Sequence, residues 1–187
     1  MANPALEEPI PSEPVDGYAD LSSVLPLTAE IVDGHLWVGG VDMVELARDT
    51  GTALYVMDEA HIRSQLREFR KWTSYHWKDV ETVYAAKAFM CTAMCKVVHE
   101  EGCMVLCASG GELAIALAAG VPASRILVHG NNKTSLEIDE AVQAGVHRIL
   151  ADSLPEPGRT RAAATPAGLG RTGPLPLTPG ARPAPHG

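Results

Sequence analysis

The chain has 187 residues, of which 46% are hydrophobic and 20% charged, and its formal net charge is −8. This composition is ordinary for a soluble globular protein, and the acidic balance argues against a general nucleic-acid-binding role, which needs basic surfaces to neutralise phosphates. No apolar run of about 18 residues is present to span a membrane. The N-terminal residues also lack the basic and apolar regions of a signal peptide, so the expected compartment is the cytoplasm.

The N-terminal third predicts a leader followed by short elements. Residues 1–30 are rich in proline and acids and predict a flexible leader. Beyond it, hydrophobic patterning predicts a short strand over 35–40, a helix over 41–49, a strand over 52–57 and a charged helix over 59–72.

From residue 82 onward, strands and helices alternate. We predict strands over 82–86, 103–107, 125–128 and 148–151, with helices over 91–100, 111–119 and 136–144 between them. Ser109 and Thr134 are each followed three residues later by glutamate, which is the pattern of a capping box at a helix start. Such alternation predicts βαβ units and a parallel sheet, either open or closed into a barrel.

This pattern ends near Ser153. Residues 154–187 contain eight of the fourteen prolines and four arginines, but no valine, isoleucine, cysteine or aromatic residue. A segment of this composition buries too little apolar area to offset its ordering entropy, so we predict a disordered Pro/Gly/Arg-rich tail. A shifted reading frame and ordinary disorder would both give such a tail.

Lys87 closes a short strand of small apolar residues and is the main chemical candidate. A lysine whose pKa is lowered by burial forms Schiff bases with carbonyl compounds, including pyridoxal phosphate. The alternative is a lysine at the end of a strand with its ammonium in solvent. The run His-Gly-Asn-Asn-Lys at 129–133 follows a predicted strand, where α/β sites gather, although turn chemistry explains the same residues.

Two further motifs have structural interpretations that compete with chemical ones. Gly110 and Gly111 lie between a strand and a helix and could cradle a phosphate, although no complete nucleotide motif surrounds them. The cysteines could form a zinc site, but they fall on a predicted helix and strand rather than on tight knuckles. We therefore expect small buried hydrophobic residues and no metal site; the cysteines are Cys91, Cys95, Cys103 and Cys107.

Taken together, several segments resemble the diaminopimelate decarboxylases, within the fold-type III family of pyridoxal-phosphate enzymes. The resemblance covers about residues 31–153 and is carried by these stretches: 51–59, 84–89 (Tyr-Ala-Ala-Lys-Ala-Phe), 100–102, 108–113 (Ala-Ser-Gly-Gly-Glu-Leu), 116–126, 129–133, 141–146 and 151–153.

The resemblance implies an α/β fold, namely a partial (β/α)8 barrel of the TIM type found in alanine racemase. Residues 31–153 would supply a pre-barrel strand and the first four βα units. Lys87 would hold pyridoxal 5'-phosphate as a Schiff base, Ala85 would lie under the cofactor ring, and His129 would contact the cofactor. The implied reaction is decarboxylation of meso-2,6-diaminopimelate to L-lysine in lysine biosynthesis, by a homodimer that binds a small amino-acid substrate.

The sequence also departs from the family pattern. Leu106 stands where the family commonly has an acidic residue, and nothing after the fourth strand resembles the family's later cofactor-binding segments. Residues 156–159 (Glu-Pro-Gly-Arg) imitate one such segment, but they follow strand four directly, and we take the match as coincidence. We therefore expect a truncated chain with little or no catalysis. The alternatives are a non-functional fragment and a non-catalytic cofactor carrier of the same barrel type.

Overall fold

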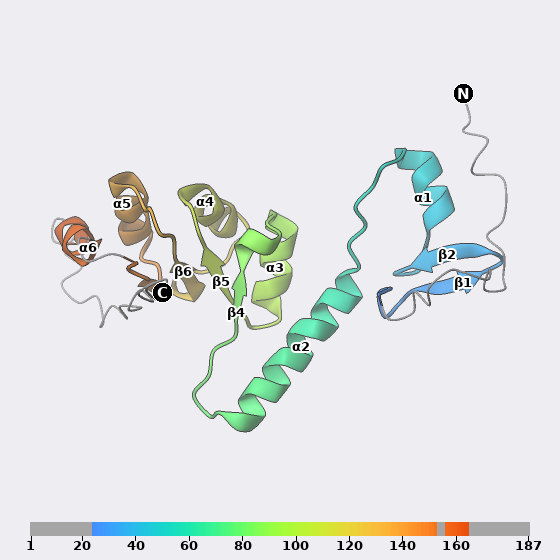
Figure 1. Ribbon diagram of the computed structural model, residues 1–187, viewed down its shortest axis with the longest axis horizontal. Helices are drawn as coiled ribbons and strands as arrows, with labels where there is room; N and C mark the ends of the chain where they lie inside the picture. The colour runs from blue at the N-terminus through green and yellow to red at the C-terminus, as the bar shows by residue number, and fades with distance from the viewer. Residues whose placement is uncertain (1–23, 153–155, 165–187) are drawn as a thin grey trace, which may run out of the picture. The chain divides into compact units, whose positions relative to one another are not determined.

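The computed structural model describes residues 24–152 and 156–164. The chain divides between Glu68 and Phe69 into two compact units, which are described separately below (Figure 1). Most of the predicted leader and the end of the predicted tail lie outside the described residues. The domain boundaries expected from the sequence stay predictions.

The first unit is built on a small antiparallel sheet of strand order β1-β2-β3 (Figure 1). Trp37 in the central strand pairs with Glu30 on one side and Asp42 on the other. Asp42 then begins the following helix, because its carboxylate accepts the N–H of Val44 at 2.8 Å. The elements are β1 (Glu30–Val32), β2 (His35–Val38), β3 (Val41–Asp42), α1 (Met43–Thr50) and the start of α2 (Glu59–His76).

The predicted strand over 52–57 is wrong. These residues form no strand, and their apolar side chains are exposed, with Tyr55 fully so. Their β-branched and aromatic residues favour an extended backbone, but a strand also needs a partner to satisfy its N–H and C=O groups. No described strand lies against this segment. Asp58 follows it and starts α2 by accepting the N–H of His61 at 3.1 Å, and the helix continues to His76 rather than ending near residue 72.

The second unit contains a parallel sheet of strand order β4-β5-β6-β7, as the alternating pattern predicts. Its register is regular, because each residue pairs with the residue 21 positions further along the chain. The elements are β4 (Val83–Ala85), η2 (Ala86–Ala88), α3 (Thr92–Glu100), β5 (Met104–Cys107), α4 (Gly110–Ala118), η3 (Ala123–Arg125), β6 (Ile126–Val128), α5 (Ser135–Ala144), β7 (Arg148–Ile149) and α6 (Glu156–Ala164).

The two faces of this sheet are covered differently. Val105 and Ile126 are register partners and are fully buried against the helical layer of α3, α4 and α5. The adjacent row, which runs through Ala85, Leu106 and Leu127, points to the other face, and its side chains are partly exposed. Among the described residues, helices therefore cover one face only, which we call the helical face; the other is the open face. Figure 1 shows these helices side by side along the sheet.

A disordered tail is predicted over 154–187, and helix α6 corrects this prediction for residues 156–164. Residues 156–164 form this helix and pack against α5. Glu156 and Thr160 are almost completely buried. Pro157 lies in the first turn, where proline is tolerated, and Ala162 and Ala163 have high helix propensity. The prediction failed because it rested on the composition of the whole segment, whereas Glu156 near its start is paired with the buried Lys133.

The predicted caps are present with one difference. Thr134 and Glu137 form a reciprocal capping box at the start of α5. Ser109 accepts the N–H of Glu112 at 3.3 Å, but the Glu112 carboxylate bonds the N–H of Ala108, at 2.6 Å, rather than that of Ser109. Both carboxylates thus stabilise loops at the carboxyl ends of strands. Over the described ranges, no helix is long and apolar enough to cross a membrane.

The helical face should carry the stability of the second unit. We expect Ile126→Ala to lower the free energy of unfolding by about 2–5 kcal/mol, because the substitution leaves a cavity in a packed core. Leu136→Ala, on the exposed side of α5, should change it by less than about 0.5 kcal/mol. Urea denaturation followed by circular dichroism measures both. Equal losses would contradict the assignment of the core to this face.

Candidate functional site

The carboxyl ends of β4 to β7 lie at one edge of the sheet, because the strands are parallel and in register. The polar residues that follow these strands are therefore brought to the same edge, as in other parallel α/β folds. Lys87 follows β4, His129 follows β6 and Asp152 lies just beyond β7.

Lys87 lies in the short turn η2, directly after β4. The turn is closed by the Tyr84 hydroxyl, which donates to the carbonyl of Phe89 at 2.9 Å, and Ala86 anchors it in the core. The Lys87 side chain is exposed rather than buried, as in the alternative of a strand-end lysine with its ammonium in solvent. Within the described part of the chain, no hydrogen bond or ion pair engages its ammonium, so the amine is available to a ligand at this edge.

Ala85, Leu106 and Leu127 form an apolar strip on the open face. They are neighbours by strand register, and each is half-buried. Ala85 is the smallest of the three and stands next to the turn that carries Lys87. Because Leu106 occupies the centre of the strip, no carboxylate is present where the resemblance would place one. The strip suits a flat apolar surface of a ligand, such as an aromatic ring.

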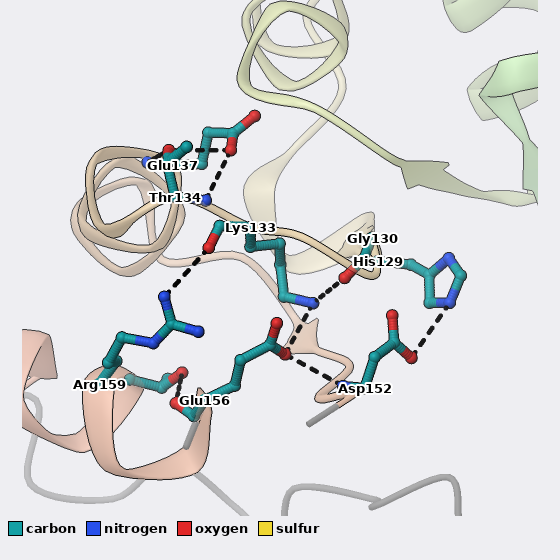
Figure 2. Close-up of polar contacts among 9 residues, drawn as sticks. His129, Gly130, Lys133, Thr134, Glu137, Asp152, Glu156 and Arg159 are labelled. Atoms are coloured by element: carbon teal, nitrogen blue, oxygen red, sulfur yellow. Dashed lines mark hydrogen bonds and ion pairs between the residues drawn. The ribbon is translucent and has the colours of Figure 1, made fainter. Parts of the chain in front are cut away.

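His129 and Asp152 face each other across the ends of β6 and β7 (Figure 2). The N–H of His129 donates to the carbonyl of Cys107 at 2.8 Å, which fixes its backbone. Its Nε2 lies 3.5 Å from Oδ1 of Asp152. The second carboxylate oxygen of Asp152 is buried and has no hydrogen-bond partner in the described residues. A buried acceptor of this kind is costly unless a donor reaches it, so this oxygen is able to accept a hydrogen bond from a ligand at this edge.

A buried ion pair between Lys133 and Glu156 lies next to the contact between His129 and Asp152. Nζ of Lys133 is 3.0 Å from Oε2 of Glu156 and also donates to the carbonyl of Gly130. The same carboxylate oxygen accepts the N–H of Asp152 at 3.0 Å (Figure 2). The pair therefore joins the loop after β6 to the end of β7.

The structure thus places Ala85 and Lys87 together at β4, and His129 two strands away at β6. Sequence reasoning missed Asp152 as the partner of His129 and missed the pairing of Lys133 with Glu156. One signal was available for the second, because a cation in a buried loop needs an acid, and Glu156 is the only acidic residue among residues 154–187.

Burial makes three of the four cysteines poor ligands and nucleophiles. The pKa of the Cys107 thiol is raised to about 12 by burial, and burial also raises the pKa values of Cys95 and Cys103. These thiols stay protonated near neutral pH, whereas metal binding and nucleophilic attack need the thiolate. In the described ranges, no group of three or more His, Cys, Asp or Glu residues is arranged to hold a metal ion.

The suggested phosphate cradle at Gly110 and Gly111 is occupied by a carboxylate. Oε1 of Glu137 accepts the Gly110 N–H at 3.1 Å, so this helix start already carries a negative partner. What the edge does offer is an unengaged primary amine, an apolar strip and an imidazole–carboxylate pair. This set of groups fits an aromatic aldehyde, which reacts with an amine while its ring lies on an apolar surface.

Comparison with known proteins gives consistent results. Residues 59–163 match the family model described as pyridoxal-dependent decarboxylase, pyridoxal binding domain. Diaminopimelate decarboxylase of Halalkalibacterium halodurans is 44% identical over 123 residues, which make up 66% of this chain and 28% of that protein. The enzyme of the same name from Mycobacterium tuberculosis is 42% identical over 141 residues, 73% of this chain and 30% of that one.

A solved structure extends the likeness to the fold. Diaminopimelate decarboxylase from M. jannaschii in complex with L-lysine superposes with a TM-score of 0.67 at 34% identity, covering 75% of this chain and 33% of that chain. The chain spans about 30% of the length of the curated relatives it matches. The family match continues to residue 163, so it includes most of α6 as well as the segment up to Ser153.

Glu137 should make the stability of this edge depend on pH. Hydrogen bonds from Thr134 and from the Gly110 N–H hold the pKa of its carboxyl below the usual 4.5 in the folded state. The contribution of this carboxylate to the free energy of unfolding should therefore be complete above about pH 4.5. It should be lost as the pH falls through the pKa of the folded state. We expect Glu137→Gln to cost about 1–2 kcal/mol at neutral pH, because one amide oxygen cannot accept from both loops.

Denaturation midpoints of the wild type and Glu137→Gln between pH 3 and pH 7 test this dependence. The difference between them should shrink towards the acid end. A difference that stays constant across this range would show that the carboxylate charge does not act here.

Proposed function

Because the chain belongs to the pyridoxal-dependent decarboxylase family, through the pyridoxal-binding domain matched at residues 59–163, we propose that Lys87 binds the aldehyde of pyridoxal 5'-phosphate. The α/β fold agrees with this family, since its four parallel βα units correspond to part of the barrel of the M. jannaschii enzyme. The observation that carries the proposal is the unengaged Lys87 amine at the carboxyl end of β4, beside Ala85.

Each proposed contact follows from a position at that edge. Ala85 provides the small surface on which the cofactor ring would lie, and His129 presents its imidazole from the end of β6. Asp152 faces the His129 ring and would hold its orientation. When bound, the cofactor supplies an electron sink for the carbon that loses a carboxylate. The chain's own residues bind and orient it.

The substrate proposed for the family reaction is meso-2,6-diaminopimelate, with L-lysine as the product. Two observations support this choice: the curated relatives are named diaminopimelate decarboxylases, and the M. jannaschii structure contains L-lysine. We also propose that the protein works in the cytoplasm as a homodimer, with the role in lysine biosynthesis that this reaction implies.

A second candidate is a protein that holds the cofactor without turning over substrate. It is favoured by Leu106, which leaves the strip beside Ala85 without a carboxylate, and by the engaged Gly110 N–H, which removes one donor for the phosphate. This candidate shares the Lys87 attachment and differs only in the absence of decarboxylation.

The attachment can be tested by chemical trapping. Incubation with pyridoxal phosphate, borohydride reduction and peptide mapping should place the pyridoxyl label on Lys87. Lys87→Ala should lose at least about nine-tenths of the label, because an amine is required for the reaction. Lys96→Ala is the matched control, since Lys96 is also exposed and lies one helix later. Label distributed over surface lysines, with no preference for Lys87, would refute the proposal.

The two candidate functions differ in one product. Release of carbon dioxide from carboxyl-labelled meso-diaminopimelate, dependent on pyridoxal phosphate and absent in Lys87→Ala, supports the decarboxylase. Attachment at Lys87 without release of carbon dioxide supports the carrier. Neither attachment nor release would reject both.

A further inference from the structure

Lys133 and Glu156 are the most buried charged residues among those the structure describes, at 4% and 1% exposure. Taking two charges out of water is costly, and an apolar pair of similar size is often as stable or more stable. Stability alone therefore does not account for a paired lysine and glutamate at this position. What the pair connects suggests another role.

The pair holds both sides of the contact between His129 and Asp152. On one side, Lys133 donates to the carbonyl of Gly130, the residue next to His129. On the other, Glu156 accepts the backbone N–H of Asp152 at 3.0 Å. Nζ of Lys133 and Oε2 of Glu156 are 3.0 Å apart, so one ion pair spans the gap between the two loops (Figure 2).

We infer that Lys133 and Glu156 are positioning residues that hold the Asp152 carboxylate against the imidazole of His129 at the candidate site. The ladder between β6 and β7 ends with the Leu150 N–H donating to the Val128 carbonyl, and beyond it the ion pair fixes the Gly130 carbonyl and the Asp152 N–H relative to each other. The consequence for cofactor binding rests on the proposed function, whereas the consequence for the His129–Asp152 contact does not. Supporting groups of this kind orient the residues that touch a ligand.

A purely structural role makes a different prediction. Arg159 donates to the carbonyl of Lys133 at 3.3 Å, and Thr160 bonds back to Glu156 within α6, so the pair could serve only to attach this helix. In that case, a variant with apolar residues in place of both Lys133 and Glu156 should keep both the fold and the contact between His129 and Asp152. If the pair positions Asp152, the same variant should keep the fold and lose the contact between His129 and Asp152.

The experiment is a double-mutant cycle read by NMR of the full chain without cofactor. The ring resonances of His129 are assigned from their disappearance in His129→Gln. Asp152→Asn is then introduced into the wild type and into Lys133→Met/Glu156→Met. Asp152→Asn keeps the backbone N–H that Glu156 accepts, so it changes only the group that faces the ring.

We expect Asp152→Asn to shift the His129 ring resonances in the wild type and to leave them unchanged in Lys133→Met/Glu156→Met, which we call the Met/Met background. Circular dichroism should show that both backgrounds are folded. Lys96→Met/Glu100→Met removes an exposed pair and should keep the wild-type shift. An equal shift in the wild-type and Met/Met backgrounds would overturn the inference. No shift in either would overturn it too, because Asp152 would then not contact His129.

Cofactor affinity provides a second readout. Titration with pyridoxal phosphate should give a dissociation constant about tenfold weaker in Met/Met, because a misplaced imidazole contacts the ligand poorly. The Lys96→Met/Glu100→Met control should bind as the wild type does. Failure of the wild type to bind the cofactor would count against the proposed function alone, and the NMR cycle would still decide whether the pair positions Asp152.

Discussion

Parallel pairing of β4 to β7 in a constant register determines where the important side chains of the second unit lie. Because every register partner is 21 residues further along, partners share a face and form rows across the sheet, and successive rows face opposite sides. One row packs on the helices, and the other forms the open face with Ala85, Leu106 and Leu127. The same register brings the residues after each strand to one edge. The site follows from this geometry, since Lys87, His129 and Asp152 are distant in sequence.

The sequence predicted the strands and helices of this unit well, because each is marked locally. The strands are apolar runs flanked by helical patterns, and Thr134 with Glu137 marks the start of α5. It did not predict the backbone of residues 52–57, because propensity describes one chain segment and a strand requires a second. Helix α6 escaped prediction for a related reason: Glu156 is held by Lys133, and no periodicity connects residues so far apart. Elements that depend on local signals were therefore predicted, whereas those that depend on distant partners were not.

The candidate site was predictable to the same extent. Lys87 and His129 could be named from short motifs and Ala85 from the family resemblance, and all three lie at the carboxyl ends of strands along one edge of the sheet. The contacts behind that edge could not be named. The orientation of Asp152 towards His129 and the occupation of the Gly110 N–H by Glu137 both depend on side chains that meet only after the sheet has formed. The acids of the predicted caps therefore also shape the loops around the site.

Strand order in the second unit follows chain order, and this has a consequence for how the protein is made. Each new strand pairs with the one that left the ribosome just before it, so every pairing closes one helical crossover, with partners 21 residues apart. Parallel pairing must overcome the loop-closure entropy of each crossover before its contacts form, and pairing in chain order keeps each closure to a single crossover. Assembly can proceed unit by unit during synthesis. At every stage, however, the newest strand presents an unpaired edge until the next arrives, and this edge is the part of the nascent sheet most exposed to wrong partners.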